Sequence, residues 1–161
     1  MPETNEIDTT WRLMEKIMLC MLVTHDGEGD ELRARPMSAM VRRKEHAIYF
    51  LTDARKEKDD EIEHNNSVCL TFADPSSQKY VSVSGIATLS RDKAKIADLW
   101  TPAAKIWWDN ENDPNIRILK VTPSKAQFWD GPGALVVYAK MAVAALTGAK
   151  PDLGVSGSVI L

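Results

Sequence analysis

Cysteine is scarce in this sequence: the 161 residues contain only Cys20 and Cys69. Each lies in an apolar segment, LCMLV or VCLTF, so we expect buried free thiols, and two cysteines make no disulfide framework. The three histidines are scattered through turns and a helix surface and lack the spacing of a metal site. A chain of this length can form a full core by apolar packing, without disulfides or metal.

Long apolar runs and a strong net charge are also missing. No run approaches the roughly 18 residues that a membrane span needs, and the first residues lack the basic and apolar regions of a signal peptide. The net charge is −3 and the isoelectric point is near 5.6, which argues against a general binder of nucleic acid or membrane surfaces. These absences predict a cytoplasmic protein.

The common catalytic motifs do not occur either. GxSxG, GxGxxG and the P-loop are absent. Ser82 and Ser84 alternate along a predicted strand, but no histidine is placed to activate them. The acidic run of a charged helical segment is interpreted as a solvated face: Asp59, Asp60, Glu61 and Glu63.

What the sequence does contain is a series of short segments rich in β-formers, separated by turns. Gly85, in the longest of them, suggests a bulge or bend of the kind that closes a barrel. The pattern predicts a small antiparallel β-barrel with flanking helices, as one domain over 1–161. An N-terminal helix is expected at about 5–18, and a C-terminal helix and tail at about 134–161. The predicted strands are 19–25, 31–41, 47–52, 67–74, 79–90, 116–122 and 125–130, the last two split by Pro123.

A basic cluster surrounds two neighbouring predicted strands. Thr52 ends one strand and Lys58 lies in the helix that follows, which brings a hydroxyl, helix N–H groups and an ammonium near one point. Arg35 on the neighbouring strand can supply a planar fork for the same anion. A phosphate site and a solvated charged helix both fit this spacing.

Two further features fit either a ligand site or ordinary structure. Pro36 lacks a backbone N–H, so it belongs on a sheet edge, where residues 36–38 either face a ligand or simply form that edge. Four aromatic residues of the last third could pack against a flat cofactor ring or within a core: Trp107, Trp108, Phe128 and Trp129.

Five segments in this order resemble the FMN-binding split-barrel superfamily, which includes pyridoxamine 5′-phosphate oxidase, and within it the general stress protein subgroup. They are RARPM, YFLTDARKEK, KYVSVSG, DPNIRILKVTP and QFWD, and the resemblance runs from about residue 11 to 147. It implies a mainly β fold, a six-stranded antiparallel split barrel with flanking helices. It also implies a homodimer that binds FMN, or alternatively FAD, in the cleft between its subunits.

The resemblance also implies which residues bind the cofactor. Residues 35–38 would lie along the flavin, with Arg35 at the phosphate end, where Lys58 matches the family's phosphate-binding lysine. Tyr80 falls where the oxidases have a glutamine, and Trp129 where they have a tryptophan that faces the flavin from the dimer cleft. The implied cofactor-binding residues are Arg35, Pro36, Met37, Ser38, Leu51, Thr52, Lys58, Tyr80 and Trp129.

Two departures from the oxidases concern their substrate. Met40 stands where they have a lysine for the substrate phosphate, and the chain continues into ALVVYAKMAVAALTG in place of a basic, histidine-containing motif. Pyridoxine-phosphate oxidation is therefore not expected. The resemblance implies a stress-related FMN-dependent oxidoreductase or flavin reductase; the alternatives are a non-enzymatic module that stores flavin or senses its redox state, or a barrel that binds haem or a deazaflavin. Catalytic residues stay unassigned, with Tyr80 the nearest candidate proton donor.

Overall fold

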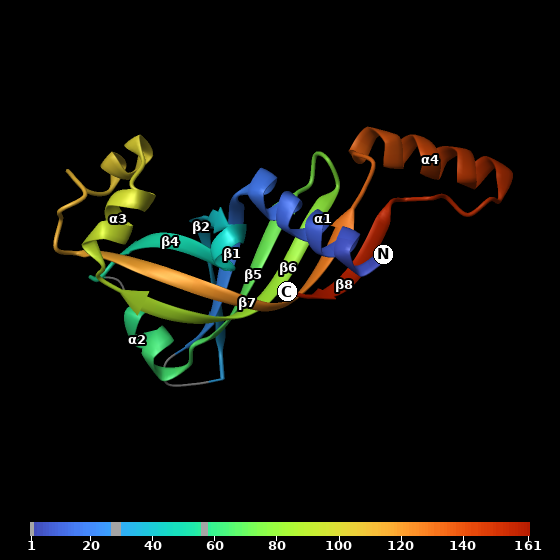
Figure 1. Cartoon of the computed structure of the whole chain (residues 1–161). Helices are drawn as coiled ribbons and strands as arrows, with labels where there is room; N and C mark the ends of the chain where they lie inside the picture. The colour runs from blue at the N-terminus through green and yellow to red at the C-terminus, as the bar shows by residue number, and fades with distance from the viewer. Residues whose placement is uncertain (1, 27–29, 56–57) are drawn as a thin grey trace.

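The computed structural model describes residues 2–26, 30–55 and 58–161, and these form eight strands of one antiparallel sheet with helices around it (Figure 1). The elements in chain order are α1 (Pro2–Ile17), β1 (Leu19–His25), β2 (Leu32–Ser38), β3 (Met40–Arg42), η1 (Arg43–Glu45), β4 (Ala47–Asp53), α2 (Lys58–His64), β5 (Ser67–Asp74), β6 (Lys79–Ser90), α3 (Lys93–Leu99), η2 (Pro102–Ile106), β7 (Ile116–Asp130), α4 (Ala134–Thr147) and β8 (Val155–Ile160). Among these helices, none is long and apolar enough to cross a membrane.

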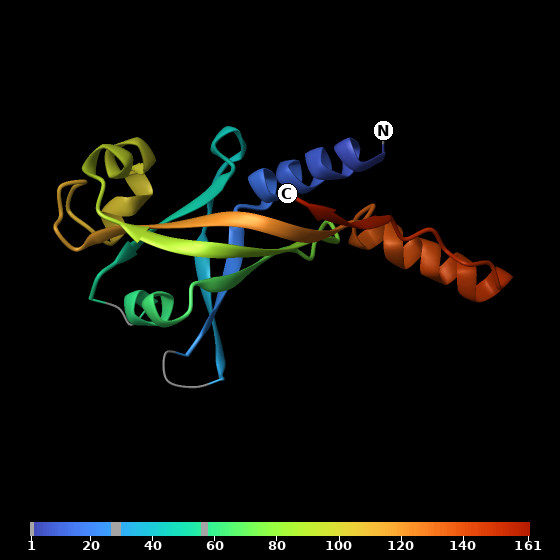
Figure 2. The same cartoon turned by 60° about the horizontal axis from the view of Figure 1, so that its bottom comes forward.

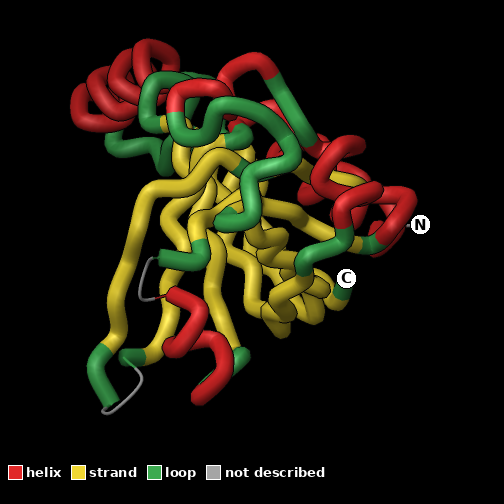
Figure 3. Tube along the Cα trace, turned by 90° about the vertical axis from the view of Figure 1, so that its left-hand side faces the viewer, coloured by secondary structure: helices red, strands yellow, loops and turns green. Residues whose placement is uncertain are grey.

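The sheet curls into a split barrel. Its strand order is β2-β1-β5-β6-β7-β4-β3, so β2 and β3 lie at opposite ends of the order although Ala39 alone separates them in the chain. The curvature that this requires is visible along the strands in Figure 3. The expected split barrel with flanking helices is confirmed, with eight strands where the sequence pattern predicts seven and the family resemblance implies six.

Strand β8 comes from the tail that follows the C-terminal helix, where no strand was expected. The long strand β7 pairs with β4 through its first half and with β8 through its second half. The tail therefore covers the part of the β7 edge that β4 leaves unpaired, and an uncovered edge would be open to pairing with other chains.

The predicted bulge lies at Gly85. Ser84 pairs with Lys125 and Gly85 with Pro123, so Ser124 is the extra residue of β7. A Cβ on Gly85 would approach the Thr122 carbonyl oxygen to 2.6 Å, which explains the glycine. The bulge also accommodates Pro123, which has no N–H to donate to the ladder. The predicted break at Pro123 is therefore wrong, because β7 continues through it.

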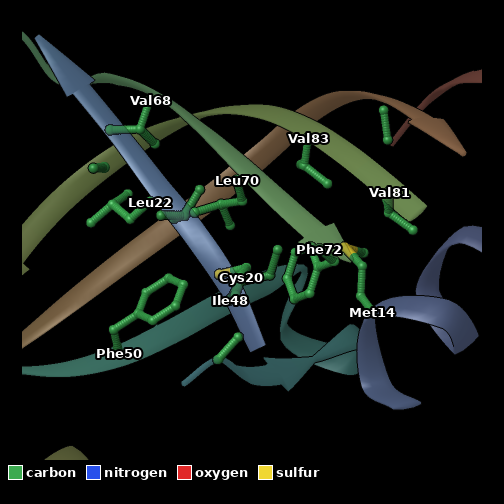
Figure 4. Close-up of a cluster of buried hydrophobic side chains, with 14 of the residues drawn as sticks. Met14, Cys20, Leu22, Ile48, Phe50, Val68, Leu70, Phe72, Val81 and Val83 are labelled. Atoms are coloured by element: carbon green, nitrogen blue, oxygen red, sulfur yellow. The ribbon is translucent and has the colours of Figure 1, made fainter. Parts of the chain in front are cut away.

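The main core fills the barrel interior. Alternate residues of β1, β4, β5 and β6 point inward, and α1 closes one opening (Figure 4). Cys20 belongs to this core, and burial raises the pKa of its thiol to about 12, as expected for an inert thiol. Both cysteines are free, as expected, but Cys69 is only half-buried, so the expected burial holds for Cys20 alone. A second, smaller core joins the outer side of β4 and β7 to α3 and η2, with Tyr49, Leu99 and Trp108 among its members.

The helix starts differ from the expectations. The N-terminal helix begins earlier than expected, at Pro2. Asp53 is the last residue of β4, and α2 begins only at Lys58. Asp92 caps α3, because its carboxylate accepts hydrogen bonds from two backbone N–H groups of the first turn.

Candidate functional site

A pocket of about 610 Å³ lies at the split of the barrel. Strand β2 forms one wall, the end of β4 another, and the segment from Leu99 to Trp108 the third. Because β2 and β4 are not neighbours in the sheet, only the curling of the barrel brings them together. Six of the nine predicted cofactor-binding residues line this pocket: Arg35, Pro36, Met37, Ser38, Leu51 and Thr52.

Thr52, which lines this pocket, carries an unsatisfied hydroxyl. The residue is only 3% exposed, and its Oγ1 is the one buried side-chain oxygen or nitrogen without a hydrogen-bond partner among the residues that the structure describes. Leaving such a group unpaired costs about 1–3 kcal/mol. An orphaned polar atom on a pocket wall therefore points to a ligand that would supply the missing partner.

Arg35 is held on the pocket wall by a buried carboxylate. Its Nη1 donates to Glu61 Oε2 at 2.7 Å, and its Nη2 donates to Glu61 Oε1 at 2.6 Å. Thr24 also donates to Glu61 Oε2 at 2.7 Å. The hydrogen bonds from Arg35, followed by that from Thr24, hold the pKa of Glu61 below its ordinary value.

This pair corrects the interpretation of the acidic run as a solvated face. Glu61 is only 3% exposed, although it lies in the charged helix α2. The neighbouring Ile62 is buried in the main core, so this side of α2 packs on the barrel. No sequence pattern indicates this pair, because Arg35 and Glu61 belong to elements that only the fold brings together.

A second buried carboxylate joins β4 to η2. Asp53 accepts hydrogen bonds at Oδ1 from the Arg55 backbone N–H, 2.9 Å, and from Arg55 Nε, 2.8 Å. Its Oδ2 accepts from Trp108 Nε1 at 3.2 Å. The contacts with Arg55 hold the pKa of Asp53 well below its usual range despite its burial. This ionised carboxylate fixes the tryptophan wall of the pocket to the end of β4.

Tyr80 and Trp129 lie away from the pocket within one chain. They are cross-strand partners on β6 and β7. Trp129 lies near one end of β7, whereas Leu51 of the pocket pairs with Ile118 near the other end of that strand. Trp129 is 44% exposed. Lys58 begins α2, but its side chain lies outside the part of the chain that the structure describes. The chain alone therefore brings together six of the nine predicted residues.

The pocket wall from α3 and η2 was missed by the sequence analysis, apart from its two adjacent tryptophans. Trp107 is 66% exposed and Trp108 is buried, so the first can contact a ligand while the second anchors the wall. No sequence pattern connects this segment to β2. In the described part of the chain, no group of His, Cys, Asp and Glu side chains could hold a metal ion.

Residues 5–152 match the family profile described as pyridoxamine 5′-phosphate oxidase like. General stress protein 26 of Bacillus subtilis (strain 168) is 31% identical to the chain over 83 residues. The match covers 47% of this chain and 56% of that protein, so it spans only about half the length of the curated relative.

Two solved structures share the fold over nearly their full lengths. A candidate general stress protein 26 from Jannaschia sp. CCS1 has a TM-score of 0.80 and 24% identity, and the match covers 98% of this chain and 99% of that one. The general stress FMN/FAD binding protein from Xanthomonas citri has a TM-score of 0.68 and 26% identity, with 91% and 96% covered.

Proposed function

The chain belongs to the pyridoxamine 5′-phosphate oxidase-like family, and from this premise we propose that it binds a flavin, FMN rather than FAD, in the split-barrel pocket. The observation that carries the proposal is the buried, unpaired hydroxyl of Thr52 on the pocket wall. The relative from Xanthomonas citri, named for binding FMN or FAD, supports the same ligand class.

The residues of the pocket fit such a ligand. A volume of about 610 Å³ is typical of sites for ligands of this size. Met37, Leu51 and Trp107 offer apolar surface to a flat ring, and Arg35 and Arg55, each paired with a carboxylate, also line the pocket. Bound FMN would supply the electron-transfer chemistry itself. The chain's own residues would orient it, pair its polar atoms and shield it from water.

The ionisable groups that line the described pocket favour binding over acid–base catalysis. They are Arg35, Asp53 and Arg55. Arginine keeps its charge at all ordinary pH values, and Asp53 stays ionised because its pKa is lowered. None of the three exchanges a proton near neutral pH. The proposed activity, a stress-related FMN-dependent oxidoreductase or flavin reductase, would therefore rely on the cofactor's chemistry.

The lack of a proton-exchanging group among the described residues that line the pocket also favours the non-enzymatic alternative, a module that stores flavin or senses its redox state. Steady-state turnover of the FMN-loaded protein with NADH or NADPH and an electron acceptor separates the two functions. Met40 also lines the pocket and brings no charge for a substrate phosphate. This supports our expectation that pyridoxine phosphate is not a substrate.

We propose a homodimer that buries the outer face of β1 and β2. Cross-strand pairs place apolar residues of both strands on this face, next to the β2 wall of the pocket. Leu19 and Leu32 are 64% and 63% exposed there, which is typical of an interaction surface. The cleft between two barrels would then bring the partner subunit's Tyr80 and the partner subunit's Trp129 to the flavin. The two free cysteines support a cytoplasmic location.

Titration of flavin-free protein with FMN, followed by the quenching of flavin fluorescence, tests the proposal. We expect saturable binding with a Kd at or below about 1 μM, roughly −8 kcal/mol. The visible spectrum of the purified protein tests haem and deazaflavin as alternative ligands. Absence of saturable FMN binding would overturn the proposal.

A further inference from the structure

Helix α4 is an apolar arm without cover. Its 14 residues, ALVVYAKMAVAALT, carry one charge, Lys140, and none of them is buried. Leu135 is 83% exposed, Val143 59% and Leu146 87%. A helix that is apolar on all sides is normally buried. Figures 1 and 2 show the arm projecting from one end of the sheet, so its own barrel cannot cover it.

The composition of α4 argues against a membrane as the surface that buries this helix. A helix of 14 residues is shorter than the roughly 20 residues that span a bilayer. Helices that lie on a membrane surface carry a strongly charged face, usually rich in lysine and arginine. The single Lys140 of α4 donates its Nζ to the backbone oxygen of Asp152 at 2.8 Å, so the arm has no such face.

The chain offers a matching apolar surface at its other end. Ile106 is 79% exposed and Trp107 is 66% exposed, and both belong to the segment that walls the split-barrel pocket. This segment and α4 lie at opposite ends of the molecule (Figures 1 and 2). In a two-fold dimer with antiparallel long axes, each arm meets the opposite end of the partner, and the contact forms twice by symmetry.

A groove on α4 gives this contact a concave side. It measures about 620 Å³ and lies between the helix and residues 149–152. Leu135, Val136 and Val143 are among its lining residues. At the other end of the molecule, the exposed side chains of Ile106 and Trp107 belong to a short 3₁₀ segment and to the residue after it.

We propose that α4 docks on a second copy of this chain, where its groove receives the partner's Ile106 and the partner's Trp107 and the arm closes the open side of the partner's pocket. The inference rests on the homodimer proposed above and assigns a role to α4 within it. Each flavin site would then be completed by the other subunit's arm.

The area of the arm is sufficient for a stable contact. A helix of 14 residues is roughly 21 Å long and about 10 Å across, so its side surface is roughly 660 Å². If half of each arm is covered, two arms and the surfaces beneath them bury about 1,300 Å², which is within the range of specific interfaces. The outer face of β1 and β2 would add to this area.

Cross-linking between copies tests the inference directly. In full-length protein with Cys20→Ala and Cys69→Ser, the pair Ile106→Cys and Val143→Cys would be treated with a short bismaleimide. The two positions lie at opposite ends of one chain, so only a contact between copies can join them. We expect a covalent dimer on a denaturing gel, and we expect none from the control pair Glu63→Cys and Val143→Cys, since Glu63 lies on α2.

Sedimentation of a second variant measures the dimer dissociation constant in protein that keeps both of its own cysteines. Leu135→Gln with Val143→Gln should raise the dimer dissociation constant by about tenfold or more, while circular dichroism shows an unchanged fold. Ile160→Gln removes an equally exposed apolar residue outside the arm and should leave the constant within about twofold. Equal effects of the two variants would overturn the inference.

Parallel measurements on the unmodified protein separate this inference from the proposed function. A dimer that binds FMN but gives no Ile106–Val143 cross-link would overturn the role of α4 and leave the flavin site intact. Loss of FMN binding and of the dimer together would overturn the proposed function itself. The third outcome concerns membranes. If the unmodified protein co-sediments with anionic phospholipid vesicles and Leu135→Gln with Val143→Gln abolishes this binding, the arm binds a membrane, and the docking on a second copy is overturned.

Discussion

At the scale of single residues, Thr52 combines a structural cost with the binding role that we propose for it. Its buried hydroxyl has no partner in the described part of the chain, whereas the hydroxyl of Thr10, equally buried, donates to the Glu6 carbonyl oxygen at 2.8 Å. Thr52 on β4 and Thr10 on α1 therefore make opposite contributions to the stability of the flavin-free protein.

Substitution of Thr52 by valine should separate folding from binding. Without FMN, Thr52→Val should leave the free energy of unfolding unchanged or raise it by about 1 kcal/mol, because an unpaired polar group is removed. Its affinity for FMN should fall about threefold to tenfold, since the ligand loses one hydrogen bond. Thermal unfolding and FMN titration measure the two effects.

Thr10→Val is the matched control for this substitution. It removes a satisfied hydrogen bond far from the pocket, so it should lower the free energy of unfolding by about 1 kcal/mol and leave FMN affinity unchanged. If Thr52→Val destabilised the protein as much and bound FMN normally, the hydroxyl would have a structural partner and no role in the site.

Lys58 is the residue that the family resemblance assigns to the flavin phosphate. Lys58→Ala should weaken FMN binding by roughly tenfold or more, because a charge-assisted hydrogen bond is lost. Riboflavin lacks the phosphate, so its affinity should change much less. Fluorescence titrations with both ligands measure the difference. Equal losses for FMN and riboflavin would show that Lys58 does not contact the phosphate.

The Glu61–Arg35 pair should make stability depend on pH. The pKa of Glu61 is lowered from 4.5 in the folded protein, so the pair stabilises the fold above about pH 4.5 and this contribution is lost as the pH falls through the folded pKa. Glu61→Gln should lower the free energy of unfolding by about 1–3 kcal/mol at pH 7. The difference from wild type should shrink as the pH approaches 3.

Urea unfolding of both proteins between pH 3 and pH 7 measures this dependence. Glu63→Gln is the control, since Glu63 lies two residues away on the same helix, is exposed and should match wild type within about 0.5 kcal/mol. A Glu61→Gln deficit that stays constant over the whole range would mean that ionisation of this carboxyl does not support the fold.

At the scale of elements, the tail strand β8 is part of the barrel rather than an appendage. It completes the β7 edge along six cross-strand pairs from Lys125 to Asp130, and Val159 enters the main core while Ile160 remains 79% exposed. Neighbouring side chains that point alternately into the core and into solvent are typical of a packed strand, so β8 is packed on the barrel.

Val159→Ala should lower the free energy of unfolding by about 1–2 kcal/mol, because two buried methyl groups are lost. The melting temperature should fall by roughly 2–8 °C for a protein of this size. Ile160→Ala, the neighbouring control, should stay within about 0.5 kcal/mol of wild type. Equal melting temperatures for the two variants would indicate that β8 does not contribute to the core. Thermal unfolding followed by circular dichroism makes the comparison.

At the scale of the whole molecule, ligand binding and folding are coupled. FMN at a hundred times its Kd should stabilise the folded protein by about 2.7 kcal/mol, which raises the melting temperature by roughly 5–11 °C. Riboflavin at the same absolute concentration should raise it less. A melting temperature that does not respond to FMN would contradict binding to the native state. Scanning calorimetry at several FMN concentrations measures the shift.

The sequence by itself determined the local features of this protein. Its alternation of apolar residues predicted most strands, Gly85 predicted the bulge, and Pro36 predicted an edge strand, because each of these depends on the backbone preferences of a few neighbouring residues. The site residues on β2 and at the end of β4 came from the resemblance to a family whose members share this order of segments.

Only the tertiary structure decided what depends on elements distant in the chain. The Glu61–Arg35 pair, the Asp53–Trp108 contact and the α3–η2 wall of the pocket join segments that meet only when the sheet curls. The same holds for the pairing of the tail with β7 and for the isolation of α4. Local propensities cannot encode these contacts, because a side chain's burial and partners are set by the elements that pack against it.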